Sequence, residues 1–265
     1  GLTGYTVRNA FHHHFDYIDK YYTPFIPAAK RMNAKIKRDI DPVNNDGITL
    51  IPQAMSIVAD EVIDLHRQLV PYGYDEINVN LGCPSGTVVS KKRGSGILAY
   101  PDMLDSFLDE LYTKADFPVS IKTRVGFNDD ELWPKLIEIY SKYPISELTV
   151  HPRVQKDFYK NTPRMDDFAL AIQKINPDKT ILCYNGDITD TNSFNALTDC
   201  FPDIDEIMIG RGLFANPALI AELKGISMDK AELRERLKNW HDEILSGYLS
   251  IFSGVSATPS IIPST

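Results

Sequence analysis

Cysteine is scarce in this chain of 265 residues, which contains three: Cys83, Cys183 and Cys200. An odd number of widely spaced cysteines without a Cys-x-x-Cys pair predicts neither a disulfide framework nor a zinc site. Long apolar runs are also missing, since none approaches the roughly 18 residues of a membrane-spanning helix, and no signal peptide opens the chain. These absences predict a cytoplasmic protein that binds neither a metal ion nor a membrane.

Positive charge is in deficit, because 28 lysines and arginines face 36 aspartates and glutamates, for a net charge of −8. Such a balance argues mildly against nucleic acid as a partner. A charge cluster is often only a solvated face, but clusters that each follow a predicted strand favour contacts with phosphate groups. Three basic clusters do so: Lys30, Arg31, Lys35, Lys37 and Arg38; Lys91, Lys92 and Arg93; and Arg153, Lys156, Lys160 and Arg164.

Strand-like and helix-like segments alternate along the chain. Between the strands, apolar residues at helical spacing predict helices, and a first helix covers residues 1–15. This rhythm indicates parallel β/α units, as found in an open doubly wound sheet or in a closed barrel. Apolar, β-rich runs predict strands over residues 21–26, 49–54, 76–80, 119–124, 147–151, 180–185 and 206–210.

A closed (β/α)8 TIM barrel is favoured because polar side chains follow nearly every predicted strand, and all such strand ends converge on one mouth of a barrel. We expect this barrel to cover residues 1–225, with its first strand missing before residue 1. Residues 226–265 then form the incomplete start of a helical domain, with irregular chain over 253–265. Its long helix over 229–248 needs a partner beyond the barrel, because it carries an apolar stripe at Leu233, Leu237, Trp240 and Ile244.

Cys83 is the candidate catalytic residue. It follows the strand in which Ile77 and Val79 alternate with Asn78 and Asn80. The next residue is a proline, which has no N–H and ends the ladder. The surrounding loop is rich in glycine, so its backbone can approach a flat ligand closely. A lone cysteine is more often a small buried apolar residue, and here the neighbouring residues favour a thiol that meets a substrate.

Two short segments predict a site for a phosphorylated cofactor. Asn185-Gly186-Asp187 and Gly210-Arg211-Gly212 follow the last two strands, and Asn216-Pro217 opens a short helix. Glycines expose backbone N–H groups, Arg211 supplies charge, and barrels often bind phosphate at this place. The alternative is a pair of ordinary tight turns.

Two cations, an imidazole and an amide complete the candidate site. Lys122 and Arg124 point to one face of a central strand, where two cations need an anionic partner. A reduced flavin would supply that partner, and a Schiff-base lysine at position 122 is the alternative. His151 ends its strand, where a structural histidine is more common than a catalyst. The amide of Gln53 can read the pyrimidine edge of a flavin.

Together these segments resemble the tRNA-dihydrouridine synthase family, flavoenzymes that reduce a uracil ring within tRNA. The resemblance covers about residues 1–223 and rests on motifs that occur in order. They are Val79–Pro84 (Val-Asn-Leu-Gly-Cys-Pro), Ile121–Gly126 (Ile-Lys-Thr-Arg-Val-Gly), Val150–Arg153 with Tyr159, Tyr184–Ile188, and Met208–Pro217.

The resemblance implies a (β/α)8 barrel with FMN at its mouth and a helical domain that helps to grip tRNA. It implies that Cys83 is the acid that protonates C5 of uracil while reduced FMN delivers hydride to C6, with NADPH or NADH as reductant. The protein would act as a monomer on a uridine that leaves its stack. The residues implied to hold the target base are Asn80, Arg124 and Tyr159. Those implied to hold the cofactor are Gln53, Lys122, His151, Asn185, Gly186, Asp187, Gly210 and Arg211.

Three other functions remain open. A flavoenzyme that reduces a free pyrimidine, such as a dihydroorotate or dihydropyrimidine dehydrogenase, would leave the basic clusters without a purpose. An RNA-binding protein without redox chemistry would make Cys83 a structural residue. A Schiff-base aldolase would use Lys122 as its nucleophile.

Overall fold

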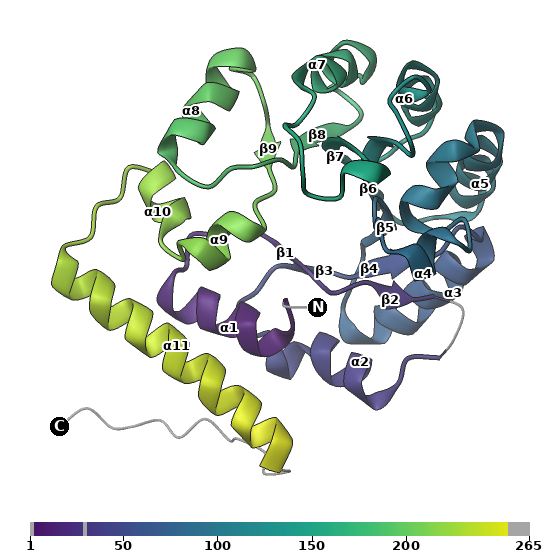
Figure 1. Ribbon diagram of the computed structural model, residues 1–265. Coiled ribbons are helices and arrows are strands. Elements are labelled where there is room, and N and C mark those ends of the chain that lie inside the picture. Colours follow the sequence, from purple (N-terminus) through teal and green to yellow (C-terminus); the bar gives the residue numbers. More distant parts are fainter. Residues whose placement is uncertain (1–2, 29–30, 254–265) are drawn as a thin grey trace.

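Seven parallel strands form the centre of the computed structural model, which describes residues 3–28 and 31–253 (Figure 1). All hydrogen-bonded neighbours run parallel, so the predicted β/α alternation is confirmed. A separate two-stranded ladder joins β1 (Tyr21–Tyr22) to β3 (Leu50–Ile51). The strand order of the main sheet is β2 (Ile26–Pro27), β4 (Gln53–Met55), β5 (Ile77–Leu81), β6 (Val119–Gly126), β7 (Glu147–Val154), β8 (Ile181–Tyr184) and β9 (Glu206–Ile207).

Two of the predicted strands are interrupted. The run over 21–26 is divided into β1 and β2, and the run over 49–54 into β3 and β4. Pro24 and Pro52 stand between the two halves of each run. Because proline has no N–H to donate, it breaks the ladder of a strand.

The described residues do not form a closed barrel, and the sequence predicts a (β/α)8 barrel whose first strand is missing from this chain. β2 and β9 are the two edges of the sheet and are not hydrogen-bonded to each other. A barrel closes only when its edge strands pair. The sheet is nevertheless curled, because Gln53 of β4 and Arg211, which follows β9, line the same cavity.

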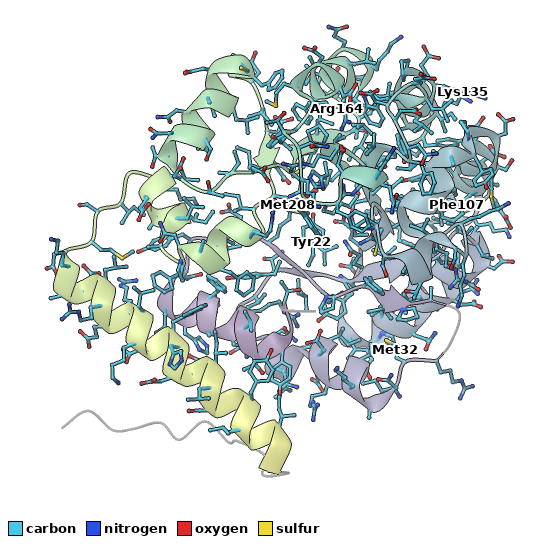
Figure 2. The ribbon with its side chains drawn as sticks, in the orientation of Figure 1. Tyr22, Met32, Phe107, Lys135, Arg164 and Met208 are labelled. Atoms are coloured by element: carbon cyan, nitrogen blue, oxygen red, sulfur yellow. The ribbon has the colours of Figure 1, made fainter. Side chains whose placement is uncertain are left out.

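Helices cover the outer face of this sheet (Figure 1). Leu148 and Val150 of β7 are fully buried in the core on that side, whereas Glu147, Thr149 and His151 alternate with them and face the inside of the curl. Tyr22 and Met208 also lie inside the curl (Figure 2). The outer helices are α3 (Ala59–Leu69), α5 (Pro101–Lys114), α6 (Trp133–Ser141), α7 (Met165–Lys174) and α8 (Thr191–Cys200). The shorter helices are α2 (Ala34–Ile40), α4 (Gly86–Val89), α9 (Arg211–Ala215) and α10 (Leu219–Leu223).

The last helix, α11 (Lys230–Ser253), packs along α1 (Tyr5–His14) (Figure 1). Its predicted apolar stripe contacts α1, where the rings of Phe11 and Trp240 lie edge to face with centroids 5.3 Å apart. The stripe therefore finds its partner in the first helix of the β/α series, and the expectation of a partner beyond that series is wrong. His13 and His14 both bind the carboxylate of Glu243, at 2.9 and 2.8 Å.

Residues 254–265, expected to be irregular chain, lie outside the described residues. Among the helices of residues 3–28 and 31–253, none combines the length and the apolar character that crossing a membrane requires.

Candidate active site

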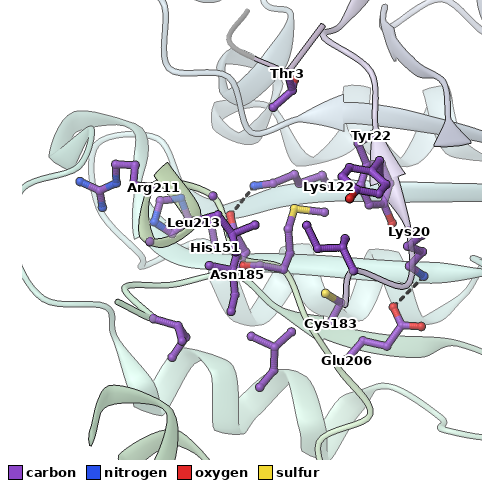
Figure 3. A pocket seen from close by; sticks show the side chains of 18 of the residues that line it. Thr3, Lys20, Tyr22, Lys122, His151, Cys183, Asn185, Glu206, Arg211 and Leu213 are labelled. Carbon is purple, nitrogen blue, oxygen red and sulfur yellow. Dashed lines mark hydrogen bonds and ion pairs between the residues drawn. The ribbon is translucent and has the colours of Figure 1, made fainter. Parts of the chain in front are cut away.

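A cavity of about 880 Å³ opens on the inner face of the sheet (Figure 3). The residues that the sequence predicts for the site are spread over about 160 positions, yet all of them line this one cavity. They are Gln53, Asn80, Cys83, Lys122, Arg124, His151, Tyr159, Asn185, Gly186, Asp187, Gly210 and Arg211. The structure therefore brings the complete predicted set together, as expected for strand ends that share one edge of a parallel sheet.

The main chain at Cys83 is held from two sides, and the residue is partly exposed to the cavity. The side-chain oxygen of Asn80 accepts hydrogen bonds from the N–H groups of Gly82 and Cys83, at 3.1 and 2.9 Å. The carbonyl of Cys83 accepts from the N–H and the hydroxyl of buried Ser95, at 3.1 and 2.9 Å. These four bonds fix the direction in which the thiol leaves the backbone.

Two glycines of the site are required by close approach. Gly94 has a φ of +54°, and a Cβ atom there would lie 2.7 Å from the carbonyl oxygen of Cys83. At Gly186 a Cβ atom would collide with the hydroxyl of Tyr184. A larger residue at either position would displace the loop that carries a predicted site residue.

Four polar side chains form a hydrogen-bonded row across β4, β5 and β6. Asn80 donates to the Oε1 atom of Gln53 at 2.7 Å, and Gln53 donates to Asn78 at 2.9 Å. Asn78 donates in turn to the hydroxyl of Ser120 at 3.1 Å. Gln53 and Asn80, which sequence reasoning identified, line the cavity. Asn78 and Ser120, which it missed, are fully buried and support these two side chains through the hydrogen bonds of the row. The signal was present, because Asn78 and Asn80 share one strand face.

Lys122 carries a positive charge without a carboxylate partner among the described residues. Its ammonium group donates to the Oδ1 atom of Asn185 at 2.6 Å (Figure 3). Asn185 is oriented for this contact because its Nδ2 group donates to the carbonyl of Met208 at 2.8 Å. Burial, and then repulsion from Arg124, lower the pKa of Lys122 to about 8. An enclosed cation that meets only an amide is suited to an anionic ligand.

Arg124 joins two loops of the rim. Its guanidinium donates to the carbonyls of Gly82, Val154 and Phe158, at 3.0, 3.0 and 2.7 Å. The side chain is 2% exposed, and burial lowers its pKa. Three of its five N–H groups therefore hold backbone, and two are left for the substrate contact that the sequence predicts.

His151 is neutral in this site. Its Nε2 atom lies 3.1 Å from Nη1 of Arg153, and it must accept there because a guanidinium has no acceptor. Burial, followed by repulsion from Lys122 and Arg124, lowers the pKa of His151 to about 2. The ring proton is consequently on Nδ1.

Asp187 connects the two arginines of the last loops. Both oxygens of its carboxylate bind Arg153, and Oδ1 also accepts from Arg211 at 2.6 Å. The hydrogen bond from Arg153 is the main cause that lowers the pKa of Asp187. Asp187 thus partly neutralises the charge that the predicted phosphate site needs. We call Lys122, Arg124, His151, Arg153, Asp187 and Arg211 the rim cluster.

The third basic cluster of the sequence is divided by the fold. Arg153 is 1% exposed and bound to Asp187, so it cannot meet a phosphate at the surface. Arg164 pairs with Asp130 at 3.0 Å and with Asp157 at 2.5 Å. Of this cluster, Lys156 and Lys160 are the exposed cations.

A second polar cluster, which sequence reasoning missed, lies at the opposite end of the same inner face. Glu147 and Glu206 begin β7 and β9, and the ammonium of Lys20 is paired with both, at 2.7 Å to Glu206 (Figure 3). The hydroxyl of Tyr22 donates to Glu147 at 3.0 Å. We call Lys20, Tyr22, Glu147 and Glu206 the floor cluster. No local pattern predicts it, because Lys20 and Glu147 are 127 positions apart.

Glu147, Cys183 and Glu206 have the composition of a metal site, with ligand atoms within 4.8 Å of one another. The ammonium of Lys20 already lies against both carboxylates. Burial would lower the pKa of Lys20, but its hydrogen bonds to the carboxylates of Glu147 and Glu206 outweigh burial and raise that pKa. Burial, with repulsion from the two glutamates, raises the pKa of the Cys183 thiol. The cluster is therefore closed by an internal cation.

Comparisons with known proteins agree with the motifs. Residues 5–246 match the family described as dihydrouridine synthase. The chain is 34% identical over 154 residues to the "Probable tRNA-dihydrouridine synthase" of Staphylococcus aureus (strain Mu50 / ATCC 700699), a match covering 57% of this chain and 46% of that protein. It is 29% identical over 168 residues to "tRNA-dihydrouridine synthase B" of Pasteurella multocida (strain Pm70), covering 63% and 49%. The chain spans about half the length of the curated relatives it matches.

Solved structures show likeness of fold alone. Dihydrodipicolinate synthase from Aquifex aeolicus superposes with a TM-score of 0.51 at 10% identity, covering 97% of this chain and 78% of that one. A putative dihydrodipicolinate synthase family protein from Coccidioides immitis gives 0.50 at 10% identity, covering 92% and 71%.

Proposed function

We infer, from the premise that this chain belongs to the dihydrouridine synthase family, that the full-length protein reduces uridine in tRNA to 5,6-dihydrouridine. The observation that carries the proposal is the gathering of the predicted site residues around one cavity, with Cys83 in its wall. A free-pyrimidine reductase would use a similar cofactor site, but the relatives named for tRNA favour the polymer as substrate.

The cavity fits a flavin, and we propose FMN. The support for a flavin is the charge of Lys122. Its ammonium group has an amide but no carboxylate beside it among the described residues, so it suits the anionic pyrimidine edge of a reduced flavin. Gln53 and His151 would contact the same ring system. The phosphate would be held by Asn185, Gly186, Gly210 and Arg211, with Asp187 orienting Arg211. When bound, FMN supplies the hydride for C6 of uracil, with electrons from NADPH or NADH.

The chain itself supplies the proton and holds the base. Cys83 donates its thiol proton to C5 as the general acid. Asn80 and Ser95 fix the backbone of Cys83, so the sulfur does not have to be oriented during the reaction. Tyr159 and the two uncommitted N–H groups of Arg124 would hold the uracil, which has left its stack to enter the cavity.

The proposal extends to the architecture of the whole protein. An eighth strand between β9 and β2 would close the curled sheet into a (β/α)8 barrel, the arrangement in which strand ends converge on one mouth. Residues 1–225 would form this catalytic domain, and residues 226–265 would begin a helical domain that binds tRNA. We propose a monomer that acts in the cytoplasm, where free thiols such as Cys83 persist.

The decisive experiment supplies full-length protein with FMN, NADPH and unmodified tRNA. Digestion of the RNA followed by mass spectrometry should show dihydrouridine, which is heavier than uridine by two hydrogens. Failure to form this product while the flavin is bound would refute the proposal.

A Schiff-base function of Lys122 is the second candidate, because a lysine with a pKa of about 8 is partly neutral and nucleophilic near neutral pH. Borohydride would then trap a carbonyl substrate on Lys122, and the adduct would be found by peptide mass mapping. We rank this candidate second because the likeness to dihydrodipicolinate synthases concerns the fold only.

A further inference from the structure

Two consecutive aromatic residues stand at the rim of the cavity and have different surroundings. Tyr159 lines the cavity, with its ring 4.7 Å from the guanidinium of Arg211 and 6.3 Å from the ring of His151. Phe158 does not line the cavity and is 46% exposed. Both rings are exposed, since Tyr159 is 55% exposed, but of the two only Tyr159 lines the cavity.

The backbone of Phe158 is held in an unfavourable conformation. Its φ is +52°, a region that bulky residues rarely adopt, and Asn161 has a φ of +60°. Buried arginines maintain this shape, because Arg124 donates to the carbonyl of Phe158 at 2.7 Å and Arg153 donates to that of Asn161 at 2.6 Å. From the other side, Asp157 accepts from Asn161 at 2.6 Å. The fold therefore keeps a large apolar ring at the surface at a cost in free energy.

Exposed lysines stand two positions before and two positions after Phe158 in the chain. Lys156 and Lys160 are both exposed, and neither forms an ion pair with the described residues. An exposed aromatic residue with unpaired lysines close to it in the chain is the composition of surfaces that stack on a nucleobase and attract its phosphates. A protein partner would meet the same ring, but the flanking positive charge in an otherwise acidic chain favours a polyanion.

We propose that Phe158 stacks on the unpaired nucleobase next to the uridine that enters the cavity, with Lys156 and Lys160 bound to the phosphates on either side. The inference rests on the proposed function. The ring of Phe158 would replace the stacking contact that the neighbouring base loses when the uridine leaves. This replacement would reduce the free-energy cost of extruding the uridine. It would act on binding of the RNA and not on proton or hydride transfer.

The test uses full-length, FMN-bound protein and compares F158A, F158G and F158W, with I181A as a matched control. Ile181 is 41% exposed but begins β8, at the end of the strand away from the rim. We expect F158A and F158G to raise the KM for tRNA about tenfold with kcat within about twofold, because one base–aromatic stack is lost. F158W and I181A should stay within about threefold of wild type.

The glycine variant separates the ring from the strained backbone. Both variants lack the ring, but glycine also adopts the positive φ without strain. If the KM were raised in F158A and equal to that of the wild type in F158G, the effect would come from backbone strain, and the proposal would be overturned. A second measurement replaces the nucleotide on each side of the modified uridine, in turn, by an abasic residue. When the nucleotide that stacks on Phe158 is the abasic one, F158A should have the same KM as the wild type. If F158A still raised the KM tenfold with both abasic substrates, the proposal would also be overturned. Failure of the wild-type protein to form dihydrouridine would instead refute the proposed function.

Discussion

The two ends of the inner sheet face carry polar clusters of opposite character. At the floor, one ammonium group, that of Lys20, lies between the carboxylates of Glu147 and Glu206. At the rim, the carboxylate of Asp187 pairs with Arg153 and Arg211, while Lys122 and Arg124 have no carboxylate partner among the described residues. All members of both clusters except Arg153 line the same cavity.

The comparison shows how a structural cluster differs from a ligand site. In the floor cluster every charge has an opposite charge within hydrogen-bonding distance, which is how buried ions are stabilised. The rim cluster has more positive than negative groups. Its half-buried Lys122 and its buried His151 both have lowered pKa values, because removal from water and neighbouring cations disfavour their charged forms. An anion at the rim would supply the missing charge.

The largest effect on the rate is expected when Cys83 is replaced, and Cys183 is the matched control. Cys83→Ala should lower the rate of dihydrouridine formation by about 10²- to 10⁴-fold, the usual contribution of a general acid. Cys183→Ala, in the same cavity but 2% exposed, should leave the rate within about twofold. The measurement is the single-turnover rate of flavin reoxidation by tRNA. Equal rates for both variants would show that the thiol of Cys83 is not the acid.

Removing the floor cation should destabilise the fold. Lys20→Met leaves Glu147, which is 3% exposed, beside Glu206 without a counter-charge, and we expect the free energy of unfolding to fall by about 2–3 kcal/mol. Lys174→Met, which removes an exposed pair with Glu138, should change it by less than about 0.5 kcal/mol. Urea unfolding followed by circular dichroism measures both. Equal small changes would mean that the floor cluster contributes nothing to the fold.

The rim histidine should make the protein sensitive to acid. Because folding lowers the pKa of His151 to about 2, the unfolded chain binds a proton below pH 6.5 that the folded chain does not. Between pH 6.5 and pH 5 this linkage should remove about 1.5 kcal/mol of stability from the wild type, and His151→Asn should lack that loss. Parallel urea titrations at the two pH values give the difference. The same loss in both proteins would place the acid sensitivity elsewhere.

Removing the rim lysine should have the smallest effect on stability and the opposite sign to Lys20→Met. Lys122→Met deletes a half-buried charge that has only an amide as partner, so the free energy of unfolding of the flavin-free protein should rise by about 1 kcal/mol. The same variant should bind FMN more weakly, by about tenfold. Thermal unfolding with and without FMN measures both quantities. Destabilisation of the flavin-free variant would contradict the view that the rim lacks an anion.

Much of the site could be predicted from local pattern. The position of Asn80 at the end of its strand, the proline after Cys83 and the polar residues that end the other strands all indicated one mouth. The predicted site residues at these places do line one cavity. The partner of α11 could not be predicted, because an apolar stripe records that a helix has a buried side but not which surface covers it. The split of the strands at Pro24 and Pro52 was available in the sequence and was overlooked.

The sequence by itself determined which kinds of side chain end each strand and which face of the strand they share, because these properties depend on neighbours two to four positions away. Only the tertiary structure decided which charges meet. Lys20 and Glu147 are 127 positions apart, and Arg153 and Asp187 are 34 apart, so no local spacing distinguishes the arginine that is neutralised from the lysine that is left without a carboxylate. That difference arises from how the curled sheet brings distant strands together, and the proposed chemistry depends on it.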